Sequence, residues 1–228
     1  MKLEQTNRII IKIGSALLFN ETSGSLNKEW LNSLAEDVKY LRENDKEVII
    51  VSSGAIAMGA KDLDLDMKNM KMDMNQAVSA VGQIHLMGSF KSAFEKNEIK
   101  ISQILLTLDD TEQRRRSINA RRTIDTLLKL GIVPVVNEND TIATSEIRYG
   151  DNDRLASRVA QITSADCLIL LSNINGLYSA DPSTDEDVKL INKVSEIDKD
   201  IEKMIGQSIS DYGKGGMKTK IQAAKTAM

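Results

Sequence analysis

The sequence predicts an α/β protein, a three-layer αβα sandwich around a mostly parallel central sheet. Short apolar runs rich in Ile, Val and Leu alternate along the chain with segments of helical period. The runs lack polar alternation, which is typical of strands buried on both faces of a parallel sheet. Alternation of strand and helix implies right-handed crossovers, with helices covering both faces of the sheet.

Five apolar runs are expected to form the strands. They span residues 9–13, 47–53, 101–108, 132–137 and 167–173.

Two of the intervening segments show the apolar spacing of an amphipathic helix. In the first, which follows a suitable N-cap at Asn27, the apolar stripe consists of Trp30, Leu31, Leu34, Val38 and Leu41. In the second, the stripe consists of Ala77, Val81, Ile84, Phe90 and Phe94.

The residues that follow the strands point to one active edge. In parallel sheets ligands bind outside the carboxyl ends of the strands. The segments at these ends carry small, glycine-bearing and acidic residues, as in "KIGSALL", "SSGAIAMGA", "NENDTIATSEIRYGDND" and "SNINGLYSADPST". The opposite ends carry ordinary charged linkers such as "ENDKE" and "EKNEIK". Lys12 interrupts the first buried run near its carboxyl end, where a lysine is rare, and is therefore a candidate functional residue.

Composition excludes several classes of protein. The 228 residues are 41% hydrophobic and 28% charged, with a net charge of −3, as in ordinary soluble globular proteins. No overall basic field invites nucleic acid or a membrane surface, and no run approaches the ~20 apolar residues that span a bilayer. The single cysteine, Cys167, fits a reducing compartment and core packing. We therefore expect a cytoplasmic protein that binds neither nucleic acid nor membranes.

One basic cluster stands out within residues 114–122. It consists of Arg114, Arg115, Arg116, Arg121 and Arg122. It is interpreted either as a solvated helix face close to Asp109, Asp110 and Glu112, or as a contact for a partner or phosphate.

No linker divides the chain, so we expect one domain over residues 1–228. A softer boundary near residue 172 separates a first lobe, about 1–171, from a second lobe, about 172–228. The last residues, "KTKIQAAKTAM", have a helical pattern without a stop signal, so the domain is expected to be incomplete at its C-terminal side.

The segment "SDYGKGGMKTKIQAAK" is the best candidate for a phosphate-binding loop. Its glycines let backbone N–H groups approach an anion, and Lys220 falls near the start of the helix that follows. The alternative is a flexible charged surface loop. Neither a Walker A loop nor a GxGxxG fingerprint is present.

The acidic segment after the fourth strand could bind an amine, bind a metal, position lysines or be a plain solvated loop. Its acids are Glu138, Asp140, Glu146, Asp151 and Asp153. The only histidine, His85, has no cysteine partners for a zinc site, and no metal ligands are predicted.

Taken together, the motifs resemble those of glutamate 5-kinases, members of the amino acid kinase superfamily. The matching segments, in order, are "IIIKIGS", "VIIVSSGAIAMG", "QAVSAVGQ", "QILLT", "NARRTIDTLLKLGIVPVVNENDTIAT", "EIRYGDNDRLAS", "NGLYSADP" and "GGMKTK". They cover about residues 8–226. The resemblance implies the amino acid kinase fold, without the RNA-binding-like PUA domain that many members add.

The resemblance also implies an activity, which is transfer of the ATP γ-phosphate to the side-chain carboxylate of L-glutamate, the first step of proline biosynthesis. It implies ATP and Mg²⁺ as cofactors, feedback inhibition by proline and a homo-oligomer, either a dimer or a tetramer. The alternatives are a related acid kinase such as an acetylglutamate kinase, or a non-catalytic ligand-binding remnant.

Residue roles follow from the same resemblance. Catalysis is expected from Lys12, Lys220 and Asp153, the last as the carboxylate that orients the two lysines. Glutamate is expected to be bound by Ser53, Gly54, Asp140 and Asn152. ATP is expected to be bound by Lys12, Gly14, Ser172, Asn173, Lys214, Gly215, Gly216, Met217, Lys218, Thr219 and Lys220. The chain departs from the common pattern in having Ser172 and Asn173 where Thr-Asp is usual, and Lys214 where threonine is common.

Overall fold

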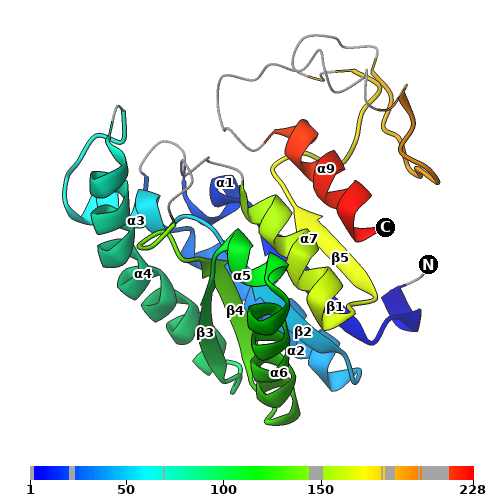
Figure 1. Ribbon diagram of the computed structural model, residues 1–228, viewed down its shortest axis with the longest axis horizontal. Helices are drawn as coiled ribbons and strands as arrows, with labels where there is room; N and C mark the ends of the chain where they lie inside the picture. The colour runs from blue at the N-terminus through cyan, green and yellow to red at the C-terminus, as the bar shows by residue number, and fades with distance from the viewer. Residues whose placement is uncertain are drawn as a thin grey trace.

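The computed structural model describes residues 3–20, 24–68, 70–143, 151–180, 182, 188–199, 201 and 216–228 (Figure 1). The strands are β1 (Arg8–Ile13), β2 (Glu47–Val51), β3 (Ile101–Leu106), β4 (Val133–Glu138) and β5 (Cys167–Leu171). The helices are the 3₁₀ turn η1 (Leu3–Gln5), α1 (Ser15–Leu18), α2 (Lys28–Glu43), α3 (Ala55–Asp62), α4 (Met72–Glu95), α5 (Leu108–Glu112), α6 (Arg114–Lys129), α7 (Asp151–Thr163) and α9 (Met217–Ala227).

The five strands form one parallel sheet in the order β3-β4-β2-β1-β5. This confirms the predicted fold class, and each predicted strand is present. Three predicted strands end earlier than expected, and one of them is β5, which stops at Leu171 rather than at residue 173. β2 stops at Val51, before the small residues of the next turn, and β3 stops at Leu106 because Thr107 caps α5 in a reciprocal hydrogen-bonded box with Asp110.

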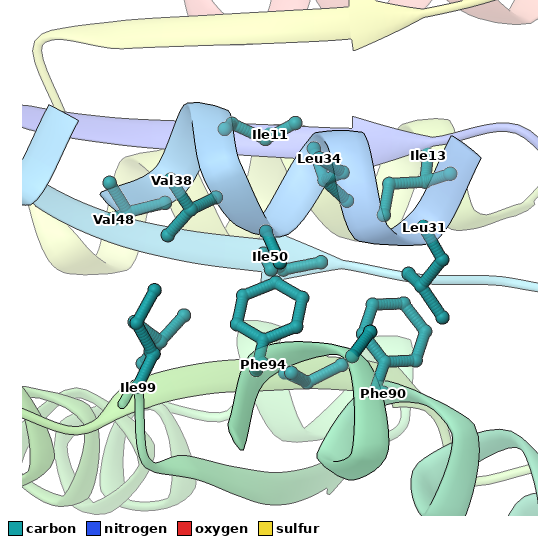
Figure 2. Close-up of a cluster of buried hydrophobic side chains, with 14 of the residues drawn as sticks. Ile11, Ile13, Leu31, Leu34, Val38, Val48, Ile50, Phe90, Phe94 and Ile99 are labelled. Carbon is teal, nitrogen blue, oxygen red and sulfur yellow. The ribbon is translucent and has the colours of Figure 1, made fainter. Parts of the chain in front are cut away.

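Helices cover both faces of the sheet, as Figure 1 shows. On one face α2 and α4 pack on the odd-numbered side chains of β1, and Figure 2 shows Phe90 and Phe94 of α4 pointing towards Ile50 and the side chains of α2. On the other face α6 and α7 pack on Ile10, Ile49 and Val136. Among the described residues, no helix is long and apolar enough to cross a bilayer.

Helix α2 agrees with its predicted stripe and cap. Leu31, Leu34, Val38 and Leu41 are buried, and the side chain of Asn27 accepts a hydrogen bond of 3.1 Å from the backbone N–H of Trp30. This contact satisfies one of the N–H groups that a helix start leaves unpaired.

The predicted stripe of α4 was partly wrong. Phe90 and Phe94 are buried, but Ile84 is 75% exposed and Ala77 is also exposed. In its N-terminal half the buried face of α4 includes the small or polar residues Ser79, Gly82 and Gln83, and α3 crosses the helix very closely there. A Cβ atom at Gly59 would lie 1.9 Å from the carbonyl oxygen of Val78, and one at Gly82 would lie 1.8 Å from that of Ala55. Only glycine permits this approach.

Candidate active site

All five strands of the sheet have their carboxyl ends at the same edge. β1 lies between β2 and β5: the chain passes from β1 to β2 on one side, and returns from β4 to β5 on the other. Such a reversal of strand order is where α/β sheets form a ligand crevice. Lys12 lies at this point, in register with Val51 of β2 and Leu170 of β5.

The alternation of β1 determines which way Lys12 faces. Ile9, Ile11 and Ile13 belong to the core under α2 and α4, whereas Ile10 belongs to the core under α7. Lys12 lies two residues after Ile10, so its side chain is on the same face of β1 and points towards α7. Asp153 lies in the first turn of α7, one helical turn before Ala156, which packs on the sheet.

Lys12 and Asp153 form a buried ion pair. The Nζ atom of Lys12 lies 2.6 Å from Oδ1 of Asp153, and the two side chains are 6% and 0% exposed. A carboxylate in the first turn of α7 is also favoured by the helix dipole.

Helix α9 brings a second lysine to the same carboxylate. In Figure 1 α9 lies beside α7, and the two helices are in contact. The Nζ atom of Lys220 lies 3.4 Å from Oδ2 of Asp153, and the hydroxyl of Thr219 donates a 2.8 Å hydrogen bond to the same oxygen. One buried carboxylate thus holds two ammonium groups that come from distant parts of the sequence.

The charge of Lys12 depends on Asp153. Burial lowers the pKa of Lys12 and the nearby charge of Lys220 lowers it further, while Asp153 raises it. Asp153 therefore keeps the ammonium form available in a site with little water. Two cations that share one anion leave positive charge for an anionic ligand.

The turn after β2 is fixed to the end of β1. The hydroxyl of Ser53 donates a 3.1 Å hydrogen bond to the carbonyl of Ile13. Gly54 has a φ of +98°, and a Cβ atom there would lie 2.5 Å from the ring of Phe19. The positive φ favours glycine where α3 begins, and any side chain there would also displace the ring of Phe19.

Asp140 lies in the loop after β4 and is anchored by α4. The hydroxyl of Ser79 donates a 2.6 Å hydrogen bond to Oδ2 of Asp140, and both side chains are buried. Burial raises the pKa of Asp140, and the hydrogen bond from Ser79 opposes this rise.

The remaining predicted residues lie around these groups. Gly14 caps α1, and Asn152 lies beside Asp153 at the start of α7 with a buried Oδ1 that accepts no hydrogen bond. Ser172 and Asn173 follow β5 and contact each other at 3.4 Å. Gly216 caps α9, and Met217 and Lys218 form its first residues. Lys214 and Gly215 lie outside the described residues.

Sequence reasoning missed Ser79. The motif "QAVSAVGQ" contains it, but nothing in the motif assigned it a contact. The feature that could have indicated it is a small polar residue in the middle of a helix that covers a sheet. The apolar stripe predicted for α4 did not include this position.

Other charged groups contact each other away from Lys12. Arg116 contacts Asp110 at 3.0 Å, and Arg154 and Arg158 both contact Glu112 at 3.1 Å. Within the basic cluster, Arg116 thus pairs with one of the nearby acids, in agreement with one of the two interpretations, whereas Arg154 and Arg158 belong to α7. Across the parts of the chain that the structure describes, no group of three or more His, Cys, Asp or Glu residues could hold a metal ion.

A separate hollow of about 450 Å³ lies beside β3. Met87, Lys91, Ile101 and Gln103 are among its lining residues, and it includes no residue predicted for the site.

Comparison with known families identifies the architecture around Lys12. Residues 7–228 match the model of the amino acid kinase family. The chain belongs to the amino acid kinase family.

Similar amino acid kinases are found among curated bacterial proteins. The chain is 59% identical to "Glutamate 5-kinase" of Pelagibacter ubique and 52% identical to that of a Ruegeria species, over 99% of this chain and 61% of each relative. It is 53% identical to "Glutamate 5-kinase 1" of Mesorhizobium japonicum, over 59% of that protein. The chain thus spans about three fifths of the length of these relatives.

A solved structure supports the amino acid kinase fold. The crystal structure of a T. acidophilum isopentenyl phosphate kinase product complex superimposes with a TM-score of 0.59, at 16% identity. The match covers 87% of this chain and 85% of that one, and at this identity it shows the fold alone.

Proposed function

We propose that this amino acid kinase transfers the γ-phosphate of ATP to the side-chain carboxylate of L-glutamate, giving L-glutamyl 5-phosphate, the first step of proline biosynthesis. The observation that carries the proposal is the pair of ammonium groups, from Lys12 and Lys220, held by the buried Asp153. The choice of L-glutamate rests on the names of the relatives that are 50–59% identical to this chain.

The chemistry suits these residues. A carboxylate nucleophile is already ionised, so the enzyme needs no strong base, only in-line positioning and neutralisation of charge on the moving phosphoryl group. Lys12 and Lys220 would supply that positive charge in a site with little water. Asp153 would keep both ammonium groups aligned before and after transfer.

The two substrates would approach from opposite sides of β1. Residues up to about 171 would form the glutamate side. Ser53 and Gly54 would bind the side-chain carboxylate that accepts the phosphoryl group. Asp140 and Asn152 would bind the α-amino acid part of the molecule. Residues from about 172 would form the ATP side. There Ser172 and Asn173 would contact the nucleotide, and Gly14 together with residues 214–220 would hold the phosphates.

Magnesium would enter with ATP. Both oxygens of Asp153 already contact Lys12, Thr219 or Lys220, so the ion would be held by phosphate oxygens rather than by this carboxylate. Bound there, Mg²⁺ would neutralise charge on the β- and γ-phosphates.

Three further properties belong to the same proposal. They are inhibition by proline, assembly of copies of the chain into a dimer or tetramer, and a cytoplasmic place of action. Light scattering on the purified chain, and assays with added proline, would test the first two.

The direct test measures ADP release with four acceptors: L-glutamate, L-aspartate, N-acetyl-L-glutamate and uridine monophosphate. We expect turnover with L-glutamate and at least tenfold less with the others. Preference for N-acetyl-L-glutamate would favour an acetylglutamate kinase. Binding of L-glutamate in calorimetry without any ADP release would favour a non-catalytic protein, and either result would overturn the proposal.

A further inference from the structure

Helix α4 lies directly against the loop that carries Asp140. Besides the contact between Ser79 and Asp140, the side-chain amide of Gln76 donates a 3.1 Å hydrogen bond to the carbonyl of Ala143. Gln76 and Ser79 are three positions apart and therefore lie on the same side of the helix. Two successive contacts thus attach residues 140–143 to one face of α4.

The contact from Ser79 occupies one specific oxygen. Its hydroxyl donates to Oδ2 of Asp140, and both groups are buried, with exposed fractions of 0% and 8%. A carboxylate can accept several hydrogen bonds, so Oδ1 stays able to meet an ammonium group. The hydroxyl therefore sets the rotation of the carboxylate as well as its place.

The same face of α4 is fixed to the turn at Gly54. On α4, the close crossing with α3 involves Val78 and Gly82, which lie on either side of Ser79 in the sequence. On the other helix, α3 begins immediately after Gly54. α4 is thus a common support for two of the segments that are proposed to hold the amino acid, the turn at Gly54 and the loop of Asp140.

We propose that Ser79 is a positioning residue for the acceptor: its hydroxyl orients the carboxylate of Asp140 towards the α-ammonium group of the amino acid, with Gln76 holding the same loop. The inference rests on the proposed function, since it assigns the α-ammonium group to Asp140. No covalent step is involved, and Ser79 acts only through Asp140.

This role implies that removing the Ser79 hydroxyl weakens the binding of L-glutamate but not the binding of ATP. Hydrogen bonds to charged groups are strong enough for removal of this hydroxyl to weaken ammonium binding about tenfold. Ser79→Ala should raise KM for L-glutamate by about this factor, while KM for ATP and kcat change less than about twofold. Ser79→Thr retains the hydroxyl, so KM for L-glutamate should stay close to that of the unchanged protein even though the added methyl group lowers stability. Gln76→Leu should raise KM for L-glutamate by a smaller factor.

Two comparisons separate this role from a loss of packing. Ser92→Ala removes a hydroxyl from the exposed face of the same helix, where it donates to the carbonyl of Gly88, and should change nothing. Glutarate lacks the amino group, so its weak phosphorylation should be equal in the unchanged protein and in Ser79→Ala. The preference for L-glutamate over glutarate should therefore fall about tenfold.

The pH profile supplies a second readout. Asp140 must be ionised to bind an ammonium group, and its pKa is raised by burial and held down by Ser79. In Ser79→Ala the acid limb of kcat/KM for L-glutamate should move to higher pH. A ¹³C NMR titration of the labelled Asp140 carboxyl should show the same upward shift without any substrate.

The outcomes are distinguishable. If the unchanged protein does not phosphorylate L-glutamate, the proposed function fails, and the NMR titration still decides whether Ser79 controls Asp140. If L-glutamate is a substrate but Ser79→Ala matches Ser92→Ala in KM and in its acid limb, the role of Ser79 is overturned while the proposed function stands. An unchanged Asp140 titration in Ser79→Ala would also overturn it.

Discussion

The ammonium group of Lys12 lies 2.6 Å from the carboxylate of Asp153, and both side chains are almost entirely buried. An ion pair in such a place costs desolvation energy that a well-packed apolar pair would avoid. Its position at the carboxyl end of β1, with Lys220 on the other oxygen, indicates that the cost supports function. We therefore expect substitutions in this pair to change both activity and stability.

Removing either ammonium group should stop phosphoryl transfer. We expect Lys12→Ala and Lys220→Ala each to lower kcat by ~10²-fold or more, because each removes a positive charge that faces the moving phosphoryl group. ADP release at saturating substrates measures this effect. Lys39→Ala, on the exposed face of α2, is the control and should retain full turnover. A kcat near that of the control in either active-site variant would refute its role.

Asp153→Asn should lower both activity and stability. The amide keeps the shape but not the charge, so Lys12 remains buried without the carboxylate that it contacts. Loss of one partner of a buried pair costs about 3–5 kcal/mol of unfolding free energy. Urea unfolding measures this loss. Adding Lys12→Met to Asp153→Asn should recover part of it, and strictly additive effects of the two changes would show that the pair is not coupled.

Asp140→Asn should change how stability depends on pH. The pKa of Asp140 is raised by burial, so the folded chain binds this proton more tightly than the unfolded chain. The carboxyl therefore makes stability fall as pH rises from about 3.9, its unfolded pKa, to its raised folded value. Asparagine cannot ionise, so the free energy of unfolding of the variant should rise relative to that of the unchanged protein as the pH increases between these two pKa values.

Urea unfolding at several pH values would check this prediction, and a difference between the two proteins that stays constant with pH would contradict it. The same variant should bind L-glutamate weakly, because it has lost the charge that faces the ammonium group. Stability and substrate binding would thus change in opposite directions.

The crossing of α3 and α4 should tolerate no side chain at Gly82. Gly82→Ala would place a Cβ atom 1.8 Å from the carbonyl of Ala55, and the helices would have to separate at a cost of about 1–3 kcal/mol. Gly88→Ala, two turns later on α4, meets nothing within 4 Å and should stabilise the chain by about 0.5–1 kcal/mol. Thermal unfolding would compare the two, and a lower Tm in Gly88→Ala than in Gly82→Ala would contradict the packing argument.

The sequence was sufficient to predict the sheet and the position of Lys12. Buried parallel strands are continuous apolar runs, so β1 was recognisable and its one lysine was conspicuous. α2 was predictable because its stripe packs on a flat apolar surface and Asn27 caps it. In both elements the local pattern and the tertiary environment agree.

The sequence was insufficient where a neighbouring helix determines which face is buried. The contact with α3 requires small residues on α4, so Gly82 and Ser79 are buried while Ile84 is exposed. An apolar periodicity cannot detect such a face. The contact between Ser79 and Asp140 joins elements far apart in the chain, and no spacing rule connects them.

The order in which the three charged residues are synthesised also matters. Lys12 lies on β1, the first strand of the sheet to be made, whereas Asp153 and Lys220 follow only after β4 and β5 respectively. A nascent chain that holds β1 and β2 but not yet α7 therefore lacks the carboxylate that Lys12 contacts in the folded protein. The buried ion pair needs α7, and its second cation needs α9, so the site is complete only when nearly all of this sequence has been made.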